Sequence, residues 1–243
     1  MRLRGKTALV IGGGTGIGWG TAKALADEGC RVAIAGRRVD VLREAAQNAG
    51  VETPIVCHEV DVANRKSVNA LFAWAQRELP PLDIVVNAAG VNIKTRMMSD
   101  MLPEQFDQVM AINSTGVYNC LHAALPAMRQ RRDGLFVNIS SISGLRAAPL
   151  GGVAYNASKF AATALGTAVG GEEAKNGIRI TSIFPGEVDT PILEHRPQPV
   201  SAERRSTMLQ PDDVGQMVVA VALLPPRAHV PELIIKPLVQ DYV

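Results

Sequence analysis

Residues 7–18 read TALVIGGGTGIG, and this stretch decides the fold. It begins with a short apolar run, Thr7–Ile11, which is typical of a strand buried on both faces. The run passes directly into a turn of glycines, and residues with helical spacing follow from Gly16. A glycine turn lets the backbone approach a phosphate closely, and the N-terminus of the next helix offers free N–H groups. The stretch therefore favours a phosphate-binding turn over a bare tight turn.

The rest of the chain repeats this alternation of strand and helix. Further strands are predicted at Arg31–Ala35, Ile55–Val60, Asp83–Asn87, Leu135–Ser140, Ile178–Ile183 and Glu232–Lys236. Helical patterns cover Gly16–Glu28, Asp40–Ala49, Arg65–Leu79, Pro103–Arg129, Gly152–Lys175 and Asp212–Leu224. Such alternation predicts an α/β fold, with residues 1–243 forming a single doubly wound, Rossmann-type domain around a parallel seven-stranded sheet. At about residues 191–211 four prolines break the pattern and indicate an irregular excursion that contacts substrate.

Composition limits the classes of partner. The 243 residues are 47% hydrophobic and 20% charged, which is typical of a globular chain. The formal net charge of +2 gives no reason to expect nucleic acid or a membrane as a partner. Because the three cysteines form no C-x-x-C motif and the four histidines are isolated, we expect neither disulfides nor a metal. The first apolar run is too short for a signal peptide, so we expect a cytoplasmic protein.

Two later strands end in residues suited to ligand contact, at the edge of the sheet where such folds bind ligands. Asp61 and Val62 follow the third predicted strand. We expect Asp61 to contact an adenine, and the alternative is that it caps the helix that follows. The fourth strand ends in Asn87-Ala88-Ala89-Gly90. The small residues Ala88 and Gly90 would either pass close to a cofactor or form a bare turn.

The segment from Tyr155 to Lys159 indicates proton chemistry. The two residues are four apart, so on a helix they share one face. A neighbouring ammonium favours the phenolate and lowers the pKa of a tyrosine. Lowering that pKa from about 10 to about 7 requires about 4 kcal/mol. The segment follows three serines in SSISG, at residues 140–144. One of these hydroxyls could bind a substrate oxygen, and the others would cap the strand end.

Together these motifs resemble the short-chain dehydrogenase/reductase family over about residues 5–190. Five match in order: the glycine turn, NAAG at residues 87–90, a helix asparagine at Asn113, Tyr155 with Lys159, and Pro185-Gly186 with Thr190. The resemblance implies an NAD(P)-dependent oxidoreductase that moves a hydride reversibly between its cofactor and a small-molecule ketone or secondary alcohol.

The resemblance also implies a role for individual residues. Tyr155 would be the general acid/base. Lys159 would bind the ribose hydroxyls and lower the pKa of that tyrosine. Asn113 would hold a proton-relay water, and Thr190 and the backbone of Val188 would anchor the carboxamide of the cofactor.

The family alignment does not identify the catalytic serine uniquely. The family's usual interval before Tyr155 falls on Ile142, whereas aligning Ser-x-x-Gly selects Ser141. We assign the role to Ser141, with Ser140 and Ser143 as alternatives.

Arg37 indicates which cofactor is preferred. It lies nineteen residues after Gly18, where an NAD site has an acid for the ribose 2′-hydroxyl. By family alignment Gly36 takes that acid's position, and a guanidinium can hold a 2′-phosphate. We therefore predict NADP(H) in preference to NAD(H), although Arg37 and Arg38 could instead be surface charges, and Thr15 is not the basic residue that some NADP-binding relatives carry. The expected cofactor contacts are Gly12, Gly14, Thr15, Gly16, Ile17, Gly18, Arg37, Arg38, Asp61, Val62, Asn87, Ala88, Gly90, Tyr155, Lys159, Pro185, Gly186, Val188 and Thr190.

Three other functions are weaker readings of the same residues. A non-catalytic dinucleotide-sensing module of this fold would not need the serine, tyrosine, lysine and asparagine together. A sugar-nucleotide epimerase carries an additional substrate domain, and only about fifty residues follow Thr190. A methyltransferase would explain the glycine turn but not Tyr155 with Lys159.

Two features bear on substrate and assembly. The excursion contains His195, Arg196, Arg204 and Arg205, which would either meet an anionic substrate group or face solvent. The helix from Gly152 has more small residues than an exposed helix requires, so we expect a partner helix within the fold or across subunits. The family resemblance implies an interface with residues 103–129, and hence a homodimer or homotetramer.

Overall fold

Seven strands form one parallel sheet in the order β3-β2-β1-β4-β5-β6-β7. The computed structural model describes residues 1–241. The strands are β1 (Thr7–Ile11), β2 (Arg31–Gly36), β3 (Val56–Glu59), β4 (Ile84–Asn87), β5 (Gly134–Ile139), β6 (Ile178–Pro185) and β7 (Glu232–Ile235). The sequence prediction of a doubly wound α/β fold is thereby confirmed, and each strand lies where it was expected to within two residues. The strand order reverses between β1 and β4, so the carboxyl ends of these two strands mark the expected ligand crevice.

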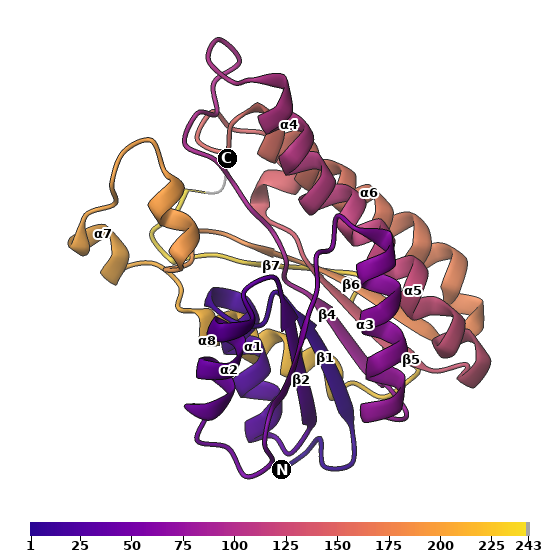
Figure 1. Cartoon of the computed structure of the whole chain (residues 1–243). Helices are drawn as coiled ribbons and strands as arrows, with labels where there is room; N and C mark the ends of the chain where they lie inside the picture. Colours follow the sequence, from indigo (N-terminus) through magenta and orange to yellow (C-terminus); the bar gives the residue numbers. More distant parts are fainter. Residues whose placement is uncertain (242–243) are drawn as a thin grey trace.

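Helices cover both faces of this sheet (Figure 1). One face carries α1 (Gly16–Asp27), α2 (Val39–Gln47) and α8 (Pro211–Ala222), and the other carries α3 (Arg65–Glu78), α5 (Gly116–Arg131) and α6 (Val153–Glu173). The shorter elements are α4 (Pro103–Met110), α7 (Ala202–Ser206), η1 (Ala111–Thr115), η2 (Ile142–Gly144), η3 (Ala174–Asn176) and η4 (Pro191–His195). Because side chains alternate along a strand, Val10 of β1 faces the first helical layer and Leu9 faces the second.

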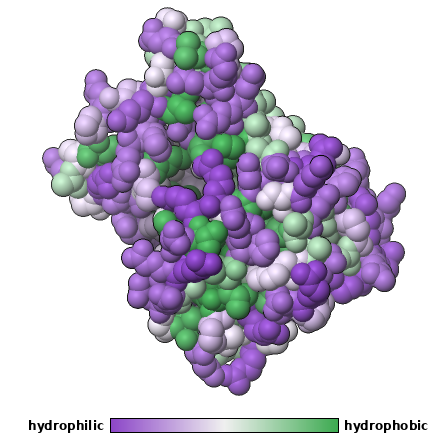
Figure 2. All heavy atoms as spheres, viewed as in Figure 1, coloured by the Kyte–Doolittle hydropathy of each residue, from purple (hydrophilic) through white to green (hydrophobic). Residues whose placement is uncertain are grey.

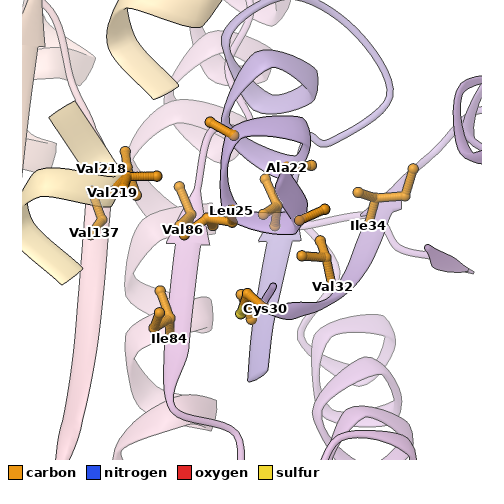
Figure 3. Packing of buried hydrophobic residues seen from close by; sticks show 14 of the residues in the cluster. Ala22, Leu25, Cys30, Val32, Ile34, Ile84, Val86, Val137, Val218 and Val219 are labelled. Carbon is orange, nitrogen blue, oxygen red and sulfur yellow. The ribbon is translucent and has the colours of Figure 1, made fainter. Parts of the chain in front are cut away.

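The layer formed by α1 and α8 is packed closely against β1 and β4. Figure 3 shows Leu25 of α1 and Val218 of α8 directed toward Val86 of β4. Two glycines allow the helices to approach one another. A Cβ on Gly20 would lie 2.6 Å from the carbonyl carbon of Pro211, and one on Gly215 would lie 2.8 Å from the carbonyl oxygen of Gly20. A larger residue at either position would separate α1 from α8, and α1 carries the glycine turn at its N-terminus.

The prediction of a single helix over Pro103–Arg129 is wrong in one respect. The structure divides it into α4, a π-helical turn η1 and then α5. Such turns are rare and widen the helix at a functional position. Here the turn contains Asn113, whose side-chain amide bonds the backbone of Val91 in a neighbouring loop. The helical pattern in the sequence does not distinguish a π turn from an α turn, because both keep apolar residues on one face.

Small residues of α6 allow this helix to pack against the sheet, whether or not a partner helix is present. A Cβ on Gly166 would lie 2.6 Å from the Ser182 hydroxyl of β6, and one on Gly170 would lie 3.7 Å from Ile180 Cβ. These glycines let α6 lie close to β6. On the outer side of the helix, Ala164, Ala168 and Gly171 are exposed, so the expectation of a homo-oligomer stays a prediction.

The excursion at residues 191–211 is less irregular than predicted, because it contains η4 and α7. Its two ends are held together, since Val188 pairs with Leu209 and the Asp189 amide donates to the Leu209 carbonyl at 2.8 Å. On the face shown in Figure 2 hydrophilic residues predominate, with small hydrophobic patches between them. Within residues 1–241 none of the helices has the length and apolar character needed to span a membrane.

Candidate active site

The glycine turn joins β1 to α1 and is packed against the loop after β4. Gly12 has φ +80°, and a Cβ there would lie 2.7 Å from the carbonyl carbon of Ala88. A Cβ on Gly18 would lie 2.1 Å from the Gly12 carbonyl oxygen. The turn therefore needs glycine at these two positions for its own close packing. It holds the first turn of α1 at the carboxyl ends of β1 and β4, with its free N–H groups at the crevice.

A cavity of about 750 Å³ runs along these carboxyl ends. Cofactor and ligand pockets span roughly 300–1,000 Å³, so it is large enough for a dinucleotide site. All but one of the expected cofactor contacts line it. Those residues are Gly12, Gly14, Thr15, Gly16, Ile17, Gly18, Arg37, Arg38, Asp61, Val62, Ala88, Gly90, Tyr155, Lys159, Pro185, Gly186, Val188 and Thr190.

The chemistry of this lining fits a phosphorylated dinucleotide. Arg37 and Arg38 are exposed at the end of β2 and form no ion pair with any carboxylate within residues 1–241. Asp61 lies beside the cavity, and its side chain accepts a hydrogen bond from the Ala63 amide at 3.0 Å. The alternative that Asp61 caps the following helix is wrong, because Asn64 is the N-cap and accepts from the amides of the first turn.

Asn87 and Asn113 lie behind the cavity wall rather than on it. Asn87 is 1% exposed, and its amide donates to Asn138 of β5 at 3.3 Å. Asn113 is fully buried, and its side chain accepts from the Val91 amide at 2.8 Å and donates to the Val91 carbonyl at 2.9 Å. The Asn113 side chain thus fixes the loop after β4.

The structure brings Ser141, and not the other two serines, to Tyr155. The Ser141 hydroxyl interacts with the Tyr155 side chain and lowers the pKa of that phenol. It also accepts from the Ser143 amide at 3.1 Å. Ser140 is 4% exposed and bonds Thr163 at 3.3 Å. The one-residue difference in spacing that makes the alignment ambiguous is therefore absorbed by the loop between Ser141 and α6.

Burial determines the protonation state of the pair on α6. Burial raises the pKa of Tyr155, and the Ser141 hydroxyl and the charge of Arg96 oppose that rise only partly. Burial also lowers the pKa of Lys159 to about 8. The expectation that Lys159, together with an oxidised nicotinamide, lowers the tyrosine pKa toward 7 stays a prediction. The Lys159 ammonium donates to the Ile139 carbonyl at 3.0 Å, and it lies 5.6 Å from the centre of the tyrosine ring.

Sequence reasoning missed Arg96, which lines the cavity from the loop after β4. Only 5% of this residue is exposed, and its charge lowers the pKa of Tyr155. No local pattern marks it, because a lone arginine in a loop resembles a solvent-facing charge. Its partners, Ile93, Leu150 and His195, include two that are distant in sequence.

The arginines of the excursion are occupied by acids of the chain. Arg196 and Arg204 both pair with Glu187, which is 9% exposed, and Arg205 pairs with Asp189 at 3.0 Å. His195 lines the cavity and accepts a bond from Arg96 through its carbonyl. The basic residues suggested by the sequence for an anionic substrate thus hold the excursion against the end of β6.

Comparison with known proteins agrees with this geometry. The family model described as short chain dehydrogenase matches residues 6–200. An uncharacterized oxidoreductase from Staphylococcus aureus (strain N315) is 33% identical over 97% of this chain and 98% of its own length. Glycine betaine reductase ATRR from Emericella nidulans is 35% identical over 97% of this chain, and the chain spans only 19% of that protein's length.

Solved structures share the fold over nearly the whole chain. An alcohol dehydrogenase from the archaeon Thermococcus sibiricus, complexed with 5-hydroxy-NADP, is 28% identical with a TM-score of 0.85, covering 97% of this chain and 98% of that one. A serine dehydrogenase complexed with NADP⁺ is 26% identical with a TM-score of 0.88, covering 97% of this chain and 96% of that one.

Proposed function

The chain belongs to the short-chain dehydrogenase/reductase family, and from this premise we propose that it transfers a hydride reversibly between NADP(H) and a ketone or secondary alcohol, with Tyr155 as general acid/base. One observation carries the proposal. Tyr155 and Ser141, whose hydroxyl lowers the pKa of Tyr155, line the same cavity as the glycine turn. The NADP complexes of similar structures support the choice of cofactor.

When bound, the nicotinamide supplies a hydride to the substrate carbon or accepts one from it. In the reductive direction Tyr155 donates its proton to the substrate oxygen. Because burial raises the pKa of this phenol, the proton is present at neutral pH. Ser141 orients the substrate oxygen through its hydroxyl, which acts on the phenol of Tyr155 in the same cavity. In the oxidative direction the same tyrosine takes the alcohol proton, which needs its pKa lowered by a positive charge beside it.

Four groups of residues would hold the cofactor. The amides of the glycine turn and of the first turn of α1 would bind the phosphates. Arg37 would bind the 2′-phosphate, and Asp61 would contact the adenine. Lys159 would bind the ribose hydroxyls from within the wall. Val188 and Thr190, on the segment after β6, would contact the carboxamide.

Replacing the tyrosine hydroxyl tests this proposal. Tyr155→Phe removes the transferable proton and should lower kcat for reduction of a carbonyl substrate by at least about 100-fold. The binding of NADPH, followed by its fluorescence, should persist. The matched control is Tyr118→Phe, because Tyr118 is 43% exposed on α5, away from the cavity lining. Turnover by the Tyr155 variant near the wild-type rate would refute the role of Tyr155 as general acid/base.

A further inference from the structure

The Arg96 guanidinium is fixed by backbone carbonyls from three separate loops. Its Nε donates to Ile93 at 2.9 Å, one terminal nitrogen donates to Leu150 at 2.7 Å, and the other donates to His195. Its stem is held as well, since a Cβ on Gly152 would lie 2.5 Å from Arg96 Cβ. This side chain is therefore held in one position beside the cavity, without needing a ligand to order it.

The charge of this guanidinium has no counter-ion within residues 1–241. Arg96 forms no ion pair there, and the nearby charge of Arg196 repels it. Glu187, which lies between β6 and the excursion, is already shared by Arg196 and Arg204. Glu194 of η4, which also lines the cavity, forms no ion pair with Arg96. A buried charge is costly unless it is paired. Carbonyl oxygens accept hydrogen bonds from the guanidinium but do not neutralise its charge. The cavity wall therefore carries a positive charge that a bound anion would neutralise.

Arg96 also retains donors for such an anion. A guanidinium has five N–H groups, and the three bonds above use one on Nε and one on each terminal nitrogen. Among the described contacts one N–H on each terminal nitrogen is left, and guanidinium N–H groups are suited to binding a carboxylate. Arg96 and Tyr155 line the same cavity, and the charge of Arg96 acts on the phenol. An anion bound by Arg96 would therefore occupy the same cavity as the reacting carbon.

We propose that the substrate is a small keto or hydroxy acid and that Arg96 binds its carboxylate. The inference rests on the proposed function of the same site. In reduction the keto acid gains a hydride at its carbonyl carbon, from NADPH, and a proton at its carbonyl oxygen, from Tyr155. The products are the hydroxy acid and NADP⁺, and the carboxylate stays bound to Arg96 without reacting.

The test compares each acid with its methyl ester, which has the same ketone and no charge. NADPH oxidation is measured with pyruvate, 2-oxobutanoate and acetoacetate, and with the three methyl esters. In at least one pair the acid should have a kcat/KM at least about tenfold above its ester. Arg96→Met should lower this acid-to-ester ratio at least about tenfold. Arg43→Met, which removes an exposed arginine of α2 outside the cavity lining, should leave the ratio unchanged.

Each other outcome has a separate meaning. If the esters are reduced as well as or better than the acids in every pair, the substrate class is wrong and the oxidoreductase proposal stands. If a folded Arg96→Met variant still prefers the acid to its ester, Arg96 does not bind the carboxylate. Arg96→Lys, which keeps the charge but lacks the paired nitrogens, replaces the Met variant if that variant does not fold, and it should lose part of the preference. If none of the six compounds consumes NADPH, this inference fails, whereas the hydride-transfer proposal, which covers any ketone or secondary alcohol, is tested separately with other carbonyl compounds.

Discussion

Replacing Arg37 with aspartate should weaken the binding of NADPH much more than the binding of NADH. Arg37 is exposed at the edge of the cavity and has no carboxylate partner within residues 1–241, so its charge is free to meet a 2′-phosphate. Two unit charges 4 Å apart interact by about 1 kcal/mol in water and about 4 kcal/mol near a protein surface. Exposure places Arg37 toward the lower figure, and the new aspartate adds repulsion. We expect a loss of about 2–3 kcal/mol, or about 30- to 150-fold in Kd for NADPH.

Fluorescence titration of NADPH and NADH against both proteins measures this change. The Kd for NADH should change by less than about threefold, because NADH has no 2′-phosphate and only a screened surface charge is altered. Arg43→Asp is the matched control, since Arg43 is an exposed arginine of α2 that pairs with Asp40 and lies outside the cavity lining. It should change neither affinity appreciably. Equal weakening of NADPH and NADH by Arg37→Asp would show that Arg37 does not contact the phosphate, and wild-type binding of NADH as tight as NADPH would refute the preference itself.

Two further predictions concern pH and assembly. The pKa of Lys159 falls from its ordinary 10.5 to about 8 in the fold, so between these values the unfolded chain binds more protons and the free energy of unfolding should rise with pH. Urea unfolding should therefore show that the free energy of unfolding of wild type, relative to that of Lys159→Met, increases from pH 8 to 10. A difference between the two proteins that does not change with pH would contradict the lowered pKa of Lys159. Tyr118 of α5 and Phe160 of α6 are each 43% exposed, and we expect them in a homodimer or homotetramer interface. Light scattering at micromolar concentration should give two or four times the 25.8 kDa of one chain, and a monomeric mass would exclude this assembly.

The positions of the strands and most helices follow from the sequence alone. Runs such as Thr7–Ile11 are apolar throughout, and a strand between two helical layers has no solvent face on which to place polar residues. Part of the glycine turn is equally local, because Gly18 is needed where the backbone nearly touches the carbonyl of Gly12, six residues earlier. The spacing of Tyr155 and Lys159 places them on one face of α6 whatever surrounds that helix. These features depend on residues that are neighbours in the chain.

The chemistry of the candidate site depends on residues that are far apart in the chain. Desolvation by the whole fold raises the pKa of Tyr155, against the direction that the nearby Lys159 suggests. Ser141 is distinguished from Ser140 only because one of them reaches Tyr155 and the other reaches Thr163.

The sequence by itself determined the doubly wound fold, the glycine turn and the face that Tyr155 shares with Lys159. Only the tertiary structure decided that Asn113 lies in a π-helical turn and bonds a loop, and that Arg96 is a buried charge beside the cavity. Secondary structure and turns are set by periodicity and backbone conformation over a few residues. Burial and hydrogen bonding are set by contacts such as those of Arg96 with Leu150 and His195, which exist only once the chain has folded.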